Sequence, residues 1–221
     1  MANLGPRALA AAMILTCGTP SAEAGTTPGQ IQFEILREGQ PFGRQTVNVR
    51  QDGESLIAQT SADLRFNIGP VTLFHYVQRC TEGWSAGALT SLTCATRENG
   101  KSRQVSGSRA SDALRFSGSS GNVQMPIATL PTSWWTRPPI ATTEMINTDT
   151  GARLPVRVTM IGREALTIAG RQVQTEHIRL QGTLTVDLWY DTAGHWVNCA
   201  FTSRGQRMTY RLLSDPARAP S

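Results

Sequence analysis

Three histidines, His75, His177 and His195, are the side chains of this sequence best suited to acid–base chemistry. Histidine titrates close to neutral pH, so each could serve as the general base of a hydrolase if a carboxylate oriented it toward a nucleophile. Ser133 is the serine in the most suggestive setting, between a proline and two tryptophans. The sequence contains no G-x-S-x-G elbow, however, and no catalytic residue can be assigned. We therefore favour a non-enzymatic protein and keep an unrecognised hydrolase as an alternative.

Metal ligation has little support in the spacing of histidines, cysteines and carboxylates. The sequence has no H-x-H, H-E-x-x-H or C-x-x-C pattern. The stretch 147–151, Asn-Thr-Asp-Thr-Gly, is similar to the start of a calcium-binding loop, but Val158 occupies the position where such a loop needs a bidentate glutamate. An ordinary turn explains the stretch. We expect neither a metal nor any other cofactor.

Four tryptophans are the residues best placed to bind an apolar molecule. Trp134 and Trp135 are adjacent on a stretch without strand periodicity, so they cannot easily both point into one core. Trp189 and Trp196 flank a predicted hairpin loop at 191–194 and would face each other across it. Such a pair commonly stabilises a sheet. Alternatively, all four indoles line the mouth of a curved sheet as a site for a lipid or another apolar ligand. Both interpretations stay open.

Residues 1–24 have the features of a signal peptide. Arg7 supplies a positive charge, a short apolar stretch follows, and Ala-Glu-Ala at 22–24 is the small-x-small pattern that signal peptidase accepts. We predict cleavage after Ala24 and a periplasmic or secreted protein. A lipoprotein anchored through Cys17 is the alternative, although a threonine precedes that cysteine where a lipid-attachment box needs a smaller residue. No later apolar run approaches the ~20 residues that span a bilayer.

The cysteines predict one disulfide. An oxidising compartment would join a matched pair, and a predicted hairpin centred on Gly87 places Cys80 directly opposite Cys94. Directly opposed residues lie close enough for a bridge. Cys199 then remains unpaired on an apolar strand face. A shift of the hairpin by one residue would instead send the two sulfurs to opposite faces of the sheet.

Nearly every other segment has the two-residue period of a half-buried strand. In the run 56–66, for example, apolar side chains alternate with Gln, Ser, Asp and Arg. Asp52-Gly53 and Asn99-Gly100 are dipeptides that favour tight hairpins. These patterns predict an all-β fold, with about twelve strands in a single strongly curved antiparallel sheet or open barrel.

One connection breaks the pattern. Near 128–150 there is no strand period, and Pro131 could open a helical turn, so we expect a short helical or irregular connection there. The segment 128–151 would join two strand blocks, 30–127 and 152–213. Since no linker-like composition separates the blocks, we predict a single β domain over 25–221.

The formal charge of +5 comes almost entirely from arginines that are scattered one by one along the predicted strands. A nucleic-acid footprint would concentrate them on one helix or stripe. The pattern therefore predicts ordinary solvated strand faces and no nucleic-acid partner.

Four motifs together point to a known family. They are Asn99-Gly100-Lys101, the stretch 130–135 (Leu-Pro-Thr-Ser-Trp-Trp), the stretch 147–151, and 187–191 (Asp-Leu-Trp-Tyr-Asp) with Gly194 and Trp196. In this order and spacing the chain resembles the uncharacterised exported proteobacterial β-proteins grouped as domain of unknown function 6134. The resemblance covers essentially the whole chain after the signal peptide. It implies a secreted or periplasmic address and a bent sheet or open barrel, and it implies no activity and no site residue.

Two functional hypotheses follow beside the hydrolase. The first is an exported cell-envelope β-protein that binds or shields a lipid or another apolar small molecule. The second is a structural envelope component, with a protein partner and without a ligand. A sizeable apolar cavity would favour the first and a filled interior the second.

Overall fold

The computed structural model describes residues 29–214. The predicted signal peptide, its cleavage site after Ala24 and the alternative lipid-attachment residue Cys17 lie outside the described residues. The described chain is built of strands and turns, and none of it forms a helix that could cross a bilayer.

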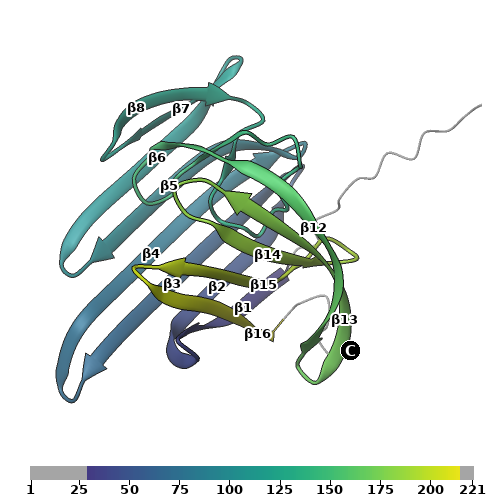
Figure 1. Cartoon of the computed structure of the whole chain (residues 1–221). Helices are drawn as coiled ribbons and strands as arrows, with labels where there is room; N and C mark the ends of the chain where they lie inside the picture. The colour runs from purple at the N-terminus through teal and green to yellow at the C-terminus, as the bar shows by residue number, and fades with distance from the viewer. Residues whose placement is uncertain (1–28, 215–221) are drawn as a thin grey trace, which may run out of the picture.

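Thirteen strands form one large antiparallel sheet in the order β12-β13-β14-β15-β16-β1-β2-β3-β4-β5-β6-β7-β8. The pairing of β1 with β16 joins the two halves of the chain. The sheet curves strongly but does not close, since β12 and β8 remain its edges (Figure 1). The all-β, curved antiparallel prediction is confirmed. The strands of this sheet are β1 (Gly29–Arg37), β2 (Gln40–Asp52), β3 (Ser55–Ile68), β4 (Val71–Ser85), β5 (Ala88–Glu98), β6 (Lys101–Ala110), β7 (Ala113–Gly118), β8 (Gly121–Pro126), β12 (Arg157–Ile168), β13 (Arg171–Gln181), β14 (Val186–Asp191), β15 (Trp196–Ser203) and β16 (Gln206–Ser214).

The connection between the two strand blocks is irregular and contains no helical turn. It carries two short strands, β9 (Leu130–Pro131) and β10 (Glu144–Ile146). With β11 (Arg153–Pro155), directly after the connection, they form a second sheet in the order β11-β10-β9. The helical alternative is wrong, and the irregular connection is confirmed, with two short strands within it. Proline lacks an amide donor, and an edge strand such as β9 tolerates it.

The tight turn predicted at Asn99-Gly100 is present, whereas the one predicted at Asp52-Gly53 lies one residue later, at Gly53-Glu54, because Asp52 still pairs with Ser55. Asn99-Gly100 joins β5 to β6, and Ala169-Gly170 joins β12 to β13, with positive φ at all four residues. This is the backbone of a two-residue hairpin turn whose twist matches that of the strands. Such turns hold successive strands in register and allow one long meander to build the curved sheet.

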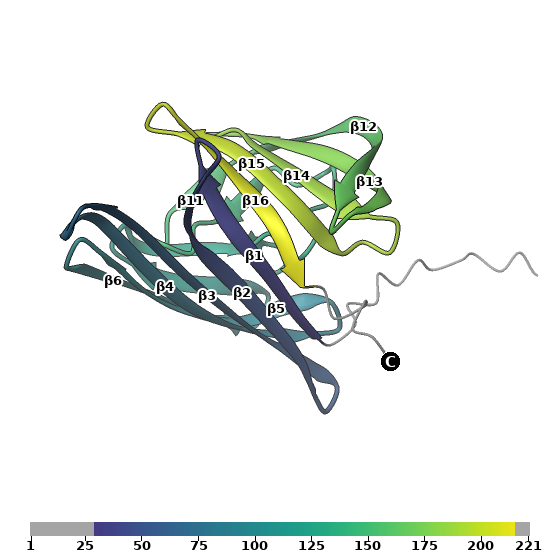
Figure 2. The ribbon, with the colours of Figure 1, turned by 90° about the horizontal axis from the view of Figure 1, so that it is seen from below.

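Curvature brings the half of the sheet around β2–β6 opposite the half around β12–β15, and the connecting segment lies between them (Figure 2). Alternate residues of each strand point into this space, as Ile31, Phe33 and Ile35 of β1 do. They pack with side chains from the other half: the rings of Phe33 and Trp196 lie 4.3 Å apart. The core therefore joins residues that are far apart in the chain.

Candidate functional site

The odd-numbered strands of the meander all end at the same rim of the curved sheet. This follows from the antiparallel order, in which β13, β15, β1, β3 and β5 run in one direction. We call this edge the open rim and define it by the turns and connections at 38–39, 69–70, 99–100, 182–185 and 204–205. The other edge is called the closed end.

A cavity of about 760 Å³ lies on the concave face and extends to the open rim. Exposed residues of the rim, such as Leu73 and Leu184, belong to its lining, so it opens to solvent there. Its walls come from both halves of the sheet and from the connecting segment. Apolar side chains form most of the interior, among them Ile35, Leu64, Phe74, Val186, Phe201 and Met208.

A few polar side chains interrupt this apolar wall. Tyr210 donates a hydrogen bond to Gln45 Oε1 over 3.4 Å, and Gln78 Nε2 donates to Thr96 Oγ1 over 3.1 Å. Burial raises the pKa of both Tyr76 and Tyr210, so their phenols remain neutral. A mostly apolar cavity with a small number of fixed polar groups is the usual form of a small-molecule site.

An ion-pair cluster fixes the cavity wall that the connecting segment provides. Arg103 on β6 binds both carboxylate oxygens of Asp149 at 2.8 and 2.9 Å and also reaches Glu98 at 3.0 Å. Asn147 Oδ1 accepts hydrogen bonds from the amides of Asp149 and Thr150, as in an Asx turn. Within residues 29–214 no group of three or more His, Cys, Asp or Glu side chains could hold a metal. The stretch 147–151 therefore functions as a turn anchored to the sheet.

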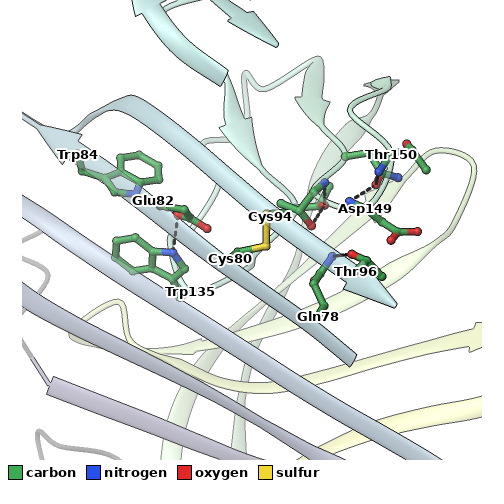
Figure 3. The surroundings of a disulfide bond; sticks show 12 residues. Gln78, Cys80, Glu82, Trp84, Cys94, Thr96, Trp135, Asp149 and Thr150 are labelled. Atoms are coloured by element: carbon green, nitrogen blue, oxygen red, sulfur yellow. Dashed lines mark hydrogen bonds between the residues drawn. A yellow bond between two sulfur atoms is a disulfide. The ribbon is translucent and has the colours of Figure 1, made fainter. Parts of the chain in front are cut away.

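The closed end is packed with buried side chains, and Glu82 lies there beside Trp84 and Trp135 (Figure 3). Glu82 is fully buried, and its Oε2 accepts hydrogen bonds from the indole N–H of Trp84 at 2.9 Å and of Trp135 at 2.8 Å. The two indoles meet edge to face, with centroids 5.4 Å apart. Trp135 thus joins the connecting segment to β4 through a hydrogen bond and ring packing.

Burial raises the pKa of Glu82, and interactions with Trp135, Ser133 and Trp84 only partly oppose the shift. The second oxygen, Oε1, is buried without a hydrogen-bond partner among the described residues. A raised pKa favours the protonated form of this carboxyl group, in which Oε1 carries the proton. Two N–H donors then bind Oε2 as they would bind a carbonyl oxygen.

The predicted disulfide marks the border between the cavity and the closed end. Cys80 and Cys94 are joined, and Cys80 belongs to the cavity lining, two residues before Glu82. Cys199 is a free, buried cysteine, as predicted. The turn differs from the prediction, however: it is centred between Ala86 and Gly87, and a bulge after Gly83 restores the pairing of the two cysteines.

The structure does not bring the four predicted tryptophans into one site. Trp134 lines the cavity, whereas Trp135 is packed at the closed end and Trp196 is buried against Phe33. Trp189 lies on the opposite face of its strand from the cavity-lining Val186, and it stacks on a histidine. The expected pairing of Trp189 with Trp196 is wrong, because the hairpin loop is one residue shorter than predicted: the Asp191 amide binds the His195 carbonyl, so Trp196 lies opposite Tyr190. A bulge then places Asn198 opposite Trp189.

Each histidine pairs with a carboxylate, but the three lie apart. His75 Nε2 is 3.2 Å from Asp63 and His195 Nδ1 is 3.1 Å from Asp191. His177 lies between two carboxylates, 3.0 Å from Asp187 and 3.2 Å from Glu164. Ser133 has no hydrogen bond to a histidine within the described part of the chain, since it lies beside Glu82 instead.

Sequence reasoning missed the polar groups of the cavity and the buried glutamate. One signal was available for Glu82: it has the same strand parity as Cys80 and Trp84, which places a carboxyl group on an apolar face. Gln45 and Gln78 gave no such signal, because glutamine is common on exposed strand faces.

Taken together, the curved open sheet and its internal cavity define a β-barrel-like protein. Residues 33–213 match the family described as domain of unknown function 6134, and the chain belongs to that family. No curated protein matches the chain. Among solved structures it is similar to the β-barrel-like protein of domain of unknown function DUF1849 from Brucella abortus. That similarity has a TM-score of 0.61 and 9% identity, and it covers 84% of this chain and 95% of the other.

Proposed function

We propose that this protein binds a lipid or another apolar small molecule in the cavity of its curved sheet. The observation that carries the proposal is the cavity of about 760 Å³, which lies within the range of volumes typical of ligand sites. Its apolar walls suit a hydrocarbon chain. Gln45, Tyr76 and Tyr210 offer neutral hydrogen-bonding groups to a polar headgroup or carbonyl.

We further propose that the protein acts in the cell envelope after export. Two observations support this address. The sequence before Gly25 has the pattern of a signal peptide, and the disulfide between Cys80 and Cys94 is typical of an oxidising compartment. Amino-terminal sequencing of the protein from its own host tests the proposal: export predicts a start at Gly25, and a lipid-modified start at Cys17 would make the protein an anchored one instead.

Native mass spectrometry of the full chain purified from its own host tests ligand binding. The expected result is an added mass that organic extraction releases as a lipid. Ala62 lines the cavity, so Ala62→Phe should fill part of it and reduce the bound fraction about tenfold. The matched control is Ala95→Phe, the same substitution at an exposed position on β5.

Two negative results together would contradict ligand binding in the cavity. If the purified chain carries no added mass and an apolar fluorescent probe binds wild type and Ala62→Phe equally, the cavity is not a ligand site. The protein would then be better described as a structural or protein-interacting component of the envelope.

A further inference from the structure

The hairpin that joins β3 to β4 extends beyond both neighbouring strands. The pairing of β3 with β2 reaches only as far as Leu64, and the pairing of β4 with β5 begins at Tyr76. Residues 65–74 therefore have no partner on β2 or β5, pair only within the β3–β4 hairpin and form a two-stranded projection at the open rim. Figure 1 draws it in blue, reaching past the adjacent turns. We call residues 65–74 the projecting hairpin.

This projecting hairpin is apolar where it is most exposed. Ile68 is 60% exposed, Val71 is 55% exposed and Leu73 is 53% exposed, with Gly69-Pro70 at the turn. An isolated two-stranded hairpin has little stability of its own in water, and an exposed apolar strand end is a liability unless something covers it. We therefore expect the molecule or surface that covers the projecting hairpin to be apolar.

The apolar face of the projecting hairpin is continuous with the cavity. Directly opposed residues of a hairpin share a face, so Ile68 and Val71 lie on the same side as Phe66 and Phe74. Phe66, Leu73 and Phe74 line the cavity. One apolar surface thus runs from the cavity to the tip of the hairpin, which is the path that a hydrocarbon chain would need between a bilayer and the cavity.

Basic side chains surround the base of the projecting hairpin. The Arg37 guanidinium lies 4.5 Å from the centroid of the Phe66 ring. Within residues 29–214 neither Arg37 nor Lys101, beside the 99–100 turn, has a carboxylate within 4.0 Å. Of the rim carboxylates, Glu98 is already bound by Arg103 and Arg204, and Glu38 accepts a hydrogen bond from the backbone amide of Arg207. Arginine and lysine side chains without an ion-pair partner beside an apolar tip complement an anionic lipid surface.

We propose that the projecting hairpin docks on anionic bilayers and brings the mouth of the cavity to the membrane surface. The tip inserts its exposed aliphatic side chains between lipid headgroups, while the arginines of the rim contact phosphate groups. This inference extends the proposed lipid binding, since it assigns the surface through which the ligand is exchanged. Docking itself requires only the hairpin and the rim.

Vesicle sedimentation tests the docking. Wild type should sediment with vesicles of equal parts phosphatidylglycerol and phosphatidylethanolamine, and it should bind more weakly to phosphatidylcholine vesicles. The double variant Ile68→Ser/Val71→Ser should reduce the affinity about tenfold or more, because two aliphatic side chains no longer enter the bilayer. The matched control is Met160→Ser/Ile161→Ser on the edge strand β12, where two residues are 39% and 48% exposed. It should bind like wild type. Circular dichroism verifies that both variants are folded.

Two results would overturn the docking proposal. In one, wild type fails to bind vesicles of either composition; if the projecting hairpin then causes self-association, which gel filtration would detect as a loss of dimers in the Ile68→Ser/Val71→Ser variant, its occupant is a second copy of this chain. In the other, the hairpin variant and the β12 variant bind equally. Native mass spectrometry separates this failure from failure of the proposed function. Bound lipid in wild type without vesicle binding leaves lipid binding intact, and vesicle binding by a protein without bound lipid leaves docking intact.

Discussion

The same strands build two different interiors at the two ends of the concave face. On β4, Tyr76, Gln78 and Cys80 line a cavity, whereas Glu82 and Trp84 are packed solid. The difference does not come from strand composition, since both ends alternate large inward side chains. It comes from what covers them: the connecting segment buries Trp135 against the closed end, whereas Trp134 and its turns only line the wall of the cavity. A curved sheet therefore becomes hollow or filled according to the path of a single crossing segment.

The largest effect should come from Trp135, which fills the closed end. Trp135→Ala removes a buried indole and one of the two N–H donors to Glu82, and we expect a loss of about 3–5 kcal/mol in the free energy of unfolding. Urea unfolding followed by circular dichroism measures it. Trp135→Phe keeps an aromatic ring but not the N–H group and should lose less. A loss below 1 kcal/mol for Trp135→Ala would mean that the closed end is not a packed core.

The disulfide at the border between the two regions should have the next largest effect. Replacing Cys80 and Cys94 together by alanine should lower the free energy of unfolding by about 3 kcal/mol, as expected for a short closed loop. Peptide mapping without reduction should show the 80–94 crosslink and a free thiol at Cys199. Cys199→Ala is the matched control, since it removes a buried sulfur without opening a crosslink. A crosslink that involves Cys199 would contradict the strand register.

The carboxyl group of Glu82 makes the stability of the closed end depend on pH. Its pKa in the unfolded chain is near 4.5, and burial raises the pKa in the folded protein. Above pH 4.5 the unfolded chain releases this proton while the folded protein retains it, so stability falls as pH rises toward the folded pKa. The loss is about 1.4 kcal/mol per pH unit across that window.

Glu82→Gln should remove this pH dependence, because the amide does not titrate and its oxygen can still accept both indole hydrogen bonds. The variant should be more stable than wild type at neutral pH and should lose that advantage near pH 4.5. Urea unfolding at a series of pH values compares the two proteins. Parallel stability curves, or a wild type that gains stability with rising pH, would show that Glu82 is ionised in the folded protein.

Local sequence patterns predicted the parts of this molecule that depend on neighbouring residues. The alternation along β1 and β3 specified which side chains face inward, and Asn99-Gly100 specified a turn. The pairing of Cys80 with Cys94 was predicted correctly although the turn was misplaced by half a residue, because the bulge after Gly83 offsets that error.

The cavity depends on contacts that no local pattern contains. Glu82 meets Trp135 across 53 positions of sequence, and their contact depends on sheet curvature and on the route of the connecting segment. Trp134 and Trp135 also lie in a stretch without strand periodicity, so the sequence does not indicate which indole is buried and which lines the cavity. Turn placement has the same consequence on a smaller scale: the loop after Asp191 is one residue shorter than predicted, so Trp196 lies opposite Tyr190 instead of Trp189.

The smallest effect on stability, and the sharpest contrast between the two ends, should come from Trp134. Its indole is only partly buried and lines the cavity, while its carbonyl oxygen accepts a hydrogen bond of 2.7 Å from the Tyr190 hydroxyl. Trp134→Ala keeps that carbonyl. Its φ of 65° is no less favourable for alanine than for tryptophan. We therefore expect a loss of about 1 kcal/mol or less in the free energy of unfolding.

The affinity of Trp134→Ala for an apolar fluorescent probe should nevertheless fall on the order of tenfold, since the variant removes a large apolar contact from the cavity wall. Trp135→Ala should show the opposite balance, with a large loss of stability and a smaller change in probe affinity while it remains folded. Titration of both variants, with unfolding measured on the same samples, compares the neighbouring positions directly. Equal losses of stability would mean that the connecting segment packs as one unit and that the cavity has no wall independent of the closed end.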